Sequence, residues 1–484
     1  MKIDDIYGLN IMLKHMRRYV FILLMAVSLT INAEVYEEGF TVTHTLPVLY
    51  INVDGAQEIV SKEDYLGADY WLDSEGDENY KSIGSKAEPK RLQIRGRGQS
   101  TWIRWEKKPY KIKLEGKESL LGMSKNKHWA LLPNAEDRSM IKNYMGFELA
   151  KRIGMQWTPS TIPVELVLNG EYWGLYFVTE NIRVSKNRVN ITEQKDDETN
   201  PDSISGGYLL EIDNYEEPNQ IRFNDGDGLL TRFTYHSPEE LSSNQQLYLE
   251  TLLKNTNDAI YVDDKTSTLW ENYIDMHSLA QYYVCMEMMN HIESFCGSCW
   301  MYKDLGDDEK IHFGPVWDFG VCYQEDRECF IYNNSPYPQH WIGEIAKFPR
   351  FQDTVKMVFS KVGGASLEAS VDSLIERINM AAIRNYERWP KSGETDLKTL
   401  KTQIFNRYYK KLEFLKQQWG ISTDIKYLSA SEVKRVSVYD MAGRKLFENR
   451  GEQSFPINTK LDGLYIIETE YSDGTRINQK QRLK

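Results

Sequence analysis

The sequence is poor in cysteine, in long apolar segments and in net positive charge. Five cysteines are too few for a disulfide scaffold in a chain of 484 residues, which favours ordinary buried or locally paired cysteines. Cys296 and Cys299 have the spacing of a redox motif without its strand-helix context, and zinc binding would need a second ligand pair. The formal net charge of -12 argues against nucleic acid as a general partner. With 41% hydrophobic residues, the chain can still bury a substantial core.

The amino end has the pattern of an export signal. Met16-Arg17-Arg18 supplies a basic start, residues 19–29 an apolar stretch and residues 31–33 a cleavage site before Glu34. The apolar stretch is shorter than the roughly 20 residues that a spanning helix needs. We therefore expect no transmembrane segment after cleavage, with a single membrane anchor as the alternative. The pattern predicts export to the periplasm, the cell surface or the medium, and Met16 is an alternative start that would make residues 1–15 an over-extended beginning.

The segment from Phe313 to Gly320, which reads FGPVWDFG, carries the clearest chemical signal. We expect a Val-Trp strand to hold Asp318 at its tip, and Gly320 to let the backbone turn so that a ligand can approach. Mg²⁺ prefers one or two such carboxylates together with phosphate oxygens, and an Asp-Phe-Gly tripeptide has this role in protein kinases. A strand that ends in a solvated turn is the ordinary alternative.

Five further segments surround this signal in a fixed order. They read RGRGQST from Arg95, KKPYKIKL from Lys107, WALLPNAEDRSMIKN from Trp129, GLYFVTENI from Gly174 and NHIESF from Asn290. In this order the motifs resemble the CotH family, the spore-coat protein H kinases and their bacterial surface relatives, over roughly residues 45 to 415. The resemblance implies an atypical protein-kinase-like fold that uses ATP with Mg²⁺ or Mn²⁺ to phosphorylate Ser or Thr of secreted or surface proteins.

Basic residues near the first two motifs are the candidates for binding nucleotide phosphates. Arg95 and Arg97 flank a glycine in a strand-loop that could wrap phosphates with backbone N–H groups and guanidinium forks, although an ordinary basic hairpin has the same composition. For the phosphate-binding lysine, the family match points to Lys108 and Lys113 ahead of Lys111.

Glu180 is the best partner to orient that lysine. It follows the apolar strand of the GLYFVTENI motif, and an ion pair would fix the position of the lysine side chain. A surface glutamate is the alternative.

Glu293 is predicted to accept the proton of the substrate hydroxyl, and it departs from the family pattern, where an Asp is usual. It lies 318 - 293 = 25 residues before Asp318, enough for a strand-turn-strand to bring both carboxylates into one cleft. A glutamate reaches one methylene farther, so the rate could fall substantially. His291 is the alternative base, and loss of catalysis is the third reading. A protein that retains the fold for adhesion or for envelope or coat assembly is thus the rival of an active kinase, and transfer of AMP is a further variant.

Hydrophobic periodicity predicts a mixed-sheet lobe followed by a helical lobe, a two-lobed α+β protein. We expect polar connections at 56–84 and 193–206. The expected strands and helices are strands at 45–53, 92–95, 109–114, 164–168, 172–178, 208–212, 300–302 and 311–313, and helices at 141–153, 237–258, 270–290, 351–362, 366–384 and 397–419.

The carboxy end predicts a separate small β module. Residues 433–484 alternate short apolar strands with glycine turns and end in a basic tail. The segment is similar to the sorting domains of the type IX secretion system of Bacteroidota, although it is shorter than a full domain, and a plain β accessory module is the alternative. The predicted domains are a signal at 1–33, a CotH kinase-like domain at 34–420, a linker at 421–432 and this module at 433–484.

Overall fold

The computed structural model describes residues 33–35, 41–196, 198–200, 203–324, 327–333, 335–390, 396–421, 433–440, 444–450, 463–471 and 476–483. The chain forms two compact units, residues 1–415 and 416–484. The predicted export signal, apart from Ala33, and nearly all of the predicted linker lie outside the described residues. Within the described residues, no helix is long and apolar enough to cross a membrane.

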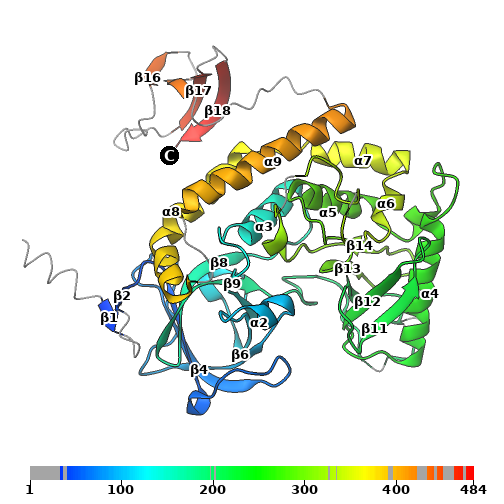
Figure 1. Ribbon diagram of the computed structural model, residues 1–484, viewed down its shortest axis with the longest axis horizontal. Helices are drawn as coiled ribbons and strands as arrows, with labels where there is room; N and C mark the ends of the chain where they lie inside the picture. The colour runs from blue at the N-terminus through cyan, green and yellow to red at the C-terminus, as the bar shows by residue number, and fades with distance from the viewer. Residues whose placement is uncertain are drawn as a thin grey trace, which may run out of the picture. The chain divides into compact units, whose positions relative to one another are not determined.

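The first lobe of unit 1 is a closed barrel of seven strands, shown at the lower left of Figure 1. The strands follow one another around the barrel in the order β3-β4-β5-β6-β7-β9-β8, and β8 closes it by pairing in parallel with β3. Their bounds are β3 (Val48–Val53), β4 (Leu66–Asp73), β5 (Lys90–Gly96), β6 (Tyr110–Glu118), β7 (Asn126–Leu132), β8 (Thr161–Leu168) and β9 (Glu171–Glu180).

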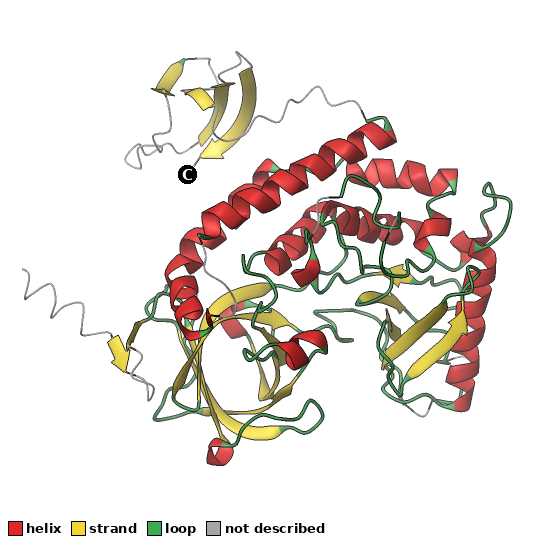
Figure 2. Cartoon of the chain, in the orientation of Figure 1, coloured by secondary structure: helices red, strands yellow, loops and turns green. Residues whose placement is uncertain are grey.

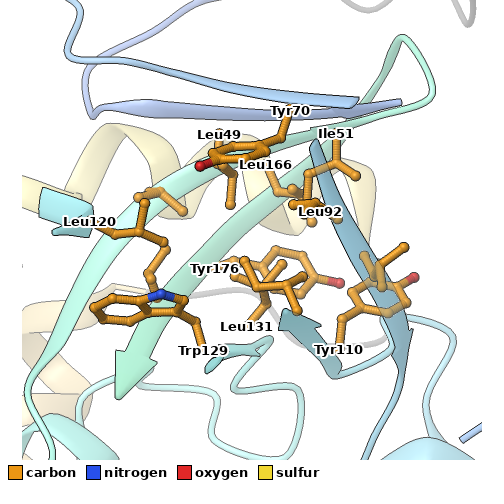
Figure 3. Close-up of a cluster of buried hydrophobic side chains, with 14 of the residues drawn as sticks. Leu49, Ile51, Tyr70, Leu92, Tyr110, Leu120, Trp129, Leu131, Leu166 and Tyr176 are labelled. Carbon is orange, nitrogen blue, oxygen red and sulfur yellow. The ribbon is translucent and has the colours of Figure 1, made fainter. Parts of the chain in front are cut away.

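Alternating side chains fill the barrel. On β6, Tyr110, Ile112 and Leu114 are buried in the core, whereas Lys111 and Lys113 lie on the outer face, because successive side chains of a strand point to opposite faces. Aromatic and aliphatic side chains from the other strands complete this core, which Figure 3 shows with Trp129 and Tyr176 among its largest members. The barrel is therefore a packed support for the residues on its outer face.

The β8–β9 turn and the first long helix carry the residues that such elements require. The hairpin β8–β9 turns at Asn169 and Gly170, both with positive φ, which is typical of a tight two-residue turn. Helix α3 (Lys142–Ile153) ends at Gly154, whose φ of 93° caps it in the left-handed conformation. Asp137 accepts a hydrogen bond from the first backbone N–H of α3, that of Lys142, at 2.9 Å.

The second lobe combines a five-stranded sheet with helices. The sheet order is β11-β12-β10-β13-β14, and Figure 1 shows it beside α4 at the right. Among the helices, α3 packs against α5 and α8, α5 against α7, and α8 against β9 of the barrel. The bounds are β10 (Tyr208–Ile212), β11 (Gln220–Asn224), β12 (Leu230–Ser237), β13 (Cys299–Lys303), β14 (His312–Phe313), α4 (Ser243–Ile260), α5 (Met276–Met288), α6 (Ile342–Ile345), α7 (Pro349–Phe359), α8 (Ala365–Arg388) and α9 (Leu397–Trp419).

The remaining elements are short or belong to unit 2. Unit 2 contains a four-stranded antiparallel sheet in the order β16-β15-β17-β18, and Figure 2 distinguishes its strands from the helices of unit 1. The bounds are β1 (Ala33–Val35), β2 (Thr41–Thr43), α2 (Ser100–Arg104), β15 (Val433–Tyr439), β16 (Lys445–Arg450), β17 (Gly463–Tyr471) and β18 (Arg476–Leu483).

Three expectations about the fold were wrong. The connection at 56–84 contains β4, because its alternating residues 66–73 complete the barrel wall. Helix α4 begins only at Ser243, where Ser242 caps it, since residues 230–237 form β12. The segment 316–318 is not a strand: β14 ends at Phe313, and Pro315 has no N–H with which to continue the ladder.

Candidate active site

A cleft of about 1370 Å³ separates the outer face of the barrel from the five-stranded sheet. Its lining includes Arg95, Arg97, His291, Glu293 and Asp318, which belong to three of the predicted motif segments. The closed barrel supplies one wall through β5, β6 and β7, and the second lobe supplies the other through β10 and the loops that follow α5 and β14.

The barrel wall of the cleft is basic. Lys111 on β6 stands opposite Arg95 on β5 in the strand register, and Arg97 and Arg183 lie nearby. Burial, together with the charges of these three arginines, lowers the pKa of Lys111 to about 8. Burial and the same positive field lower the pKa of His128 to about 3. Positive charge on this wall therefore exceeds the negative charge near it. A polyanion bound to such a wall gains favourable electrostatic energy.

Aromatic rings orient the two predicted arginines. The guanidinium of Arg95 lies 5.0 Å from the ring centre of Tyr65, and that of Arg97 lies 5.1 Å from the ring centre of Trp317. The Nε of Arg95 is buried without a hydrogen-bond partner, and burial lowers the pKa of Arg97 against the opposing charge of Asp318. A phosphate, with several acceptor oxygens, would supply acceptors for both side chains.

Asp318 lies in a strained turn rather than at the tip of a strand. Its φ of 61° is in the left-handed region, which Asp tolerates better than most residues. The backbone on either side is tied down: His291 Nε2 lies 2.8 Å from the carbonyl oxygen of Asp318, and the N–H of Phe319 donates to Asn143 Oδ1 at 2.9 Å. The side chain is exposed to the cleft. Desolvation by the surrounding protein raises the pKa of the carboxyl against the lowering effect of the charges of His291 and Arg97, and the charges of Glu293 and Glu211 add to the rise. A divalent cation would relieve that repulsion.

His291 is engaged in holding Asp318. Because a carbonyl oxygen can only accept, Nε2 of His291 carries the proton and donates it. Its Nδ1 is buried without a partner, and burial lowers the pKa of the ring. This geometry favours a positioning role for His291 over that of a base.

Glu293 lies in the loop that follows α5, half-buried and in the lining of the cleft. Its carbonyl oxygen accepts hydrogen bonds from the N–H groups of Cys296 and Gly297 at 3.0 and 2.9 Å, which fixes the turn that presents the side chain. The hairpin β13–β14, where Met301 pairs with Phe313, spans the interval to Asp318. The structure thus brings Glu293 and Asp318 into one cleft, as the spacing predicted.

Lys108, Lys113 and Glu180 are not among the residues that line this cleft. The Lys108 Nζ donates to the carbonyl oxygen of Trp102 at 2.5 Å, and the Glu180 carboxylate accepts from the N–H of Ser160 at 3.0 Å. Lys113 pairs in register with His128, farther along β6 than Lys111. The structure therefore places Lys111, which the sequence ranking had put last, where the two preferred lysines were expected.

Two carboxylates at the end of β10 were missed. Glu211 is nearly buried and pairs with His236 at 2.8 Å, and both Glu211 and Asp213 line the cleft. Burial and the charge of Glu211 raise the pKa of Asp213 to about 6. The available signal was the pair of acidic residues two apart at the end of the apolar strand 208–212, which puts both on one face.

The cysteines beside the site are free thiols, and four of the five are buried. Burial raises the pKa of Cys296 to about 12, so this thiol stays protonated at neutral pH. The described residues contain no group of three or more His, Cys, Asp or Glu side chains that could hold a metal ion. The donor set instead fits a cation that takes one or two carboxylates, Asp318 first, and completes its shell with phosphate and water.

The barrel lobe and the largely helical lobe that share this charged cleft define a two-lobed protein of mixed α and β structure. The chain belongs to the CotH family: the sequence model of that family, described as CotH kinase protein, matches residues 93–416. The match covers the basic wall, Glu293 and Asp318. No curated protein matches the chain.

Proposed function

We propose that this protein is a kinase that binds ATP with Mg²⁺ or Mn²⁺ in the cleft and transfers the γ-phosphate to Ser or Thr of exported proteins. One observation carries the proposal: a basic wall with uncompensated charge, including Lys111, faces Asp318 and Glu293 across a single cleft. Phosphoryl transfer depends mainly on positioning and on stabilising negative charge, and these side chains are suited to both.

The residues divide into a phosphate-binding set, a cation ligand and a proton acceptor. Arg95, Arg97 and Lys111 would hold the phosphates, and Asp318 would hold the cation, which neutralises phosphate charge when bound. The charge of Asp318 acts on Arg97, so the phosphate-binding side chains and the cation ligand are neighbours in the cleft. Glu293 would accept the proton of the attacking hydroxyl.

Export is part of the proposal and rests on the sequence. The basic start at residues 16–18, the apolar stretch and the cleavage pattern before Glu34 are typical of an export signal. The β module after residue 433 resembles a type IX sorting domain, which would direct the protein to the cell surface. Substrates would then be secreted or surface proteins.

The second candidate is a surface protein that keeps the fold and has lost the chemistry. The glutamate at position 293 favours it, because its side chain is one methylene longer than the Asp of the family pattern and a shift of about 1 Å can cost 100-fold in rate. Such a protein would act in adhesion or in envelope assembly.

Parallel incubations with γ-labelled and α-labelled ATP test the proposal. With Mg²⁺ or Mn²⁺, a mixture of this protein and bacterial surface proteins should incorporate label from the γ-phosphate and none from the α-phosphate. Incorporation of the α-label would indicate AMP transfer instead. No incorporation of either label, despite nucleotide binding, would favour the inactive surface protein.

A further inference from the structure

A single glutamine side chain joins the two walls of the cleft. The Oε1 of Gln99 accepts a hydrogen bond from the Nζ of Lys62 at 2.6 Å, and its Nε2 donates to Glu217 Oε1 at 2.7 Å. Gln99 and Lys62 belong to the barrel lobe, in the loops that follow β5 and β3, whereas Glu217 lies between β10 and β11 of the second lobe. All three side chains are half-buried and line the cleft. We call this pair of contacts the Gln99 bridge.

The chemistry of the two partners fixes the orientation of the amide. The ammonium group of Lys62 can only donate, and the carboxylate of Glu217 can only accept. The amide oxygen of Gln99 therefore has to face the barrel lobe and the amide nitrogen the second lobe. A carboxylate at position 99 could satisfy Lys62 but would repel Glu217.

The loop that carries Gln99 is held at its base and has a flexible joint directly before the bridge. The N–H of Gly96 donates to the carbonyl oxygen of Ser61 at 2.8 Å, which ties the loop to a neighbouring segment of the barrel lobe. The indole of Trp102 packs directly on Gly96, where a Cβ would lie 2.5 Å from the ring. Gly98, in contrast, is exposed and has a φ of 75°, so the backbone next to Gln99 can change direction at little cost.

The other end of the bridge is held by strand β11. The guanidinium of Arg222 donates from Nη1 to Glu216 Oε1 at 2.7 Å and from Nη2 to the carbonyl oxygen of Glu217 at 2.8 Å. These bonds fix the loop that presents the Glu217 carboxylate. The bridge thus joins two supported loops through one side chain that can rotate away.

We infer that the Gln99 bridge is a gate that controls access to the cleft, and that a nucleotide enters and leaves while the bridge is open. The inference rests on the proposed nucleotide site. Arg97, two residues before Gln99, belongs to the wall proposed to bind phosphate, so a nucleotide on that wall lies next to the bridge. Two hydrogen bonds with charged partners favour the closed bridge on the order of 10-fold to 100-fold. The open form is then a minor population that the free protein still visits.

Stopped-flow kinetics with N-methylanthraniloyl ATP, a fluorescent ATP analogue, and Mg²⁺ test this inference on the full chain. In Gln99→Ala we expect the association and dissociation rate constants to rise together, on the order of 10-fold, because both hydrogen bonds are lost. The dissociation constant should stay nearly the same, since a gate slows passage in both directions. Gln93→Ala is the matched control: Gln93 is exposed on β5 and is not among the residues that line the cleft, so both rate constants should match those of wild type.

A charge exchange distinguishes the gate from a general disturbance of the loop. Gln99→Glu faces Glu217 with a like charge, so both rate constants should again exceed those of wild type. Adding Glu217→Lys to Gln99→Glu restores an attractive contact across the cleft, and both rate constants should return toward the wild-type values.

The outcomes separate the gate from the proposed function. Wild-type rate constants in Gln99→Ala overturn the gate and leave the nucleotide site standing. A rise in the dissociation rate constant alone, with a matching loss of affinity, also overturns the gate, because Gln99 would then be a contact of the nucleotide. No return of the rate constants in the double variant overturns it as well. No binding of the nucleotide to wild type or to any variant overturns both claims.

Discussion

At the scale of single residues, the cleft is lined by ionisable side chains whose pKa values are shifted by desolvation and by neighbouring charges of the same sign. Lys111 and His128 lose proton affinity on the basic wall, and Asp213 and Asp318 gain it on the acidic wall. Each shift has the sign that a bound ligand of opposite charge would reverse. The wall proposed to bind phosphate and the wall proposed to bind a cation thus differ in the sign of their electrostatic potential.

Glu293→Gln should abolish transfer and spare binding. The amide keeps the shape of the side chain but accepts no proton, so the transfer rate should fall on the order of 100-fold or more, whereas ATP affinity measured by calorimetry should stay unchanged. Glu293→Asp, which restores the family residue, should retain or raise activity. A rate that survives Glu293→Gln but collapses in His291→Ala would move the base role to the histidine.

Lys111 should give nucleotide binding a step in its pH dependence. The pKa of its ammonium group is about 8 rather than the ordinary 10.5, so the free protein loses this charge as pH rises above 8, and ATP affinity should fall there. Between the folded pKa of about 8 and the ordinary value of 10.5, the unfolded chain binds more protons at this lysine than the folded chain does. The free energy of unfolding of the nucleotide-free protein therefore increases as pH rises through this range. Titrations from pH 7 to 10 should show the step in wild type and in Lys113→Met, the matched control. Persistence of the step in Lys111→Met would assign it elsewhere.

At the scale of elements, a buried carboxylate joins the barrel to helix α8. Glu165 on β8 is fully buried and accepts hydrogen bonds from the Nε and Nη2 of Arg384 at 3.0 and 2.8 Å and from the Tyr172 hydroxyl at 2.7 Å. Burial opposes its charge, but the hydrogen bond to His44 and the charge of Arg384 outweigh burial and lower the pKa of Glu165 to about 2. This cluster fixes the helix that covers β9.

Glu165→Gln should destabilise unit 1 by about 3 kcal/mol at neutral pH, since it leaves Arg384 without its buried partner. Because the folded pKa is below the ordinary value of 4.5, the stabilisation from Glu165 is present above pH 4.5 and is lost as pH falls toward 2. The difference in free energy of unfolding between wild type and variant, measured with urea, should therefore shrink from pH 7 to pH 3. A constant difference across this range would rule out the carboxylate charge as its cause.

Local signals predicted many of the elements but missed β4, β7, β11 and β12, and long-range pairing was not readable. Helix α9 and strand β10 have the predicted bounds, because their apolar periods are uninterrupted. The pairing of β3 with β8, which closes the barrel, joins segments more than 100 residues apart and leaves no mark on either strand alone. The sequence ranking of Lys113 ahead of Lys111 was wrong for the same reason. Both lysines lie on one face of β6, and only the position of the second lobe determines which of them lines the cleft.

At the scale of the whole molecule, the cleft proposed as the active site lies within unit 1. Every residue that lines the cleft precedes residue 321, and the family match ends at residue 416, where unit 2 begins. The four strands of unit 2 pair only with one another among the described residues. The carboxy-terminal β module can therefore differ in role from the cleft.

Deletion of residues 433–484 should change the destination of the protein and not the stability of unit 1. The deletion keeps α9 whole, so the melting temperature of unit 1, followed by calorimetry, should match that of the corresponding transition in the full chain. Fractionation of cells should show that the truncated protein does not reach the cell surface and stays in an inner compartment. A large fall in melting temperature would make the module part of the main fold, and unchanged delivery to the surface would remove its sorting role.

Calorimetric titration of ATP, with and without Mg²⁺, into wild-type protein and Asp318→Asn tests the central claim most directly. Asparagine also tolerates the left-handed backbone of residue 318 and has nearly the same size, so the variant should fold. The account predicts that Mg²⁺ strengthens ATP binding to wild type and that Asp318→Asn loses this metal-dependent gain while keeping the contribution of the basic wall. Equal affinity of the two proteins for ATP with Mg²⁺ would contradict the assignment of this cleft as a metal-nucleotide site.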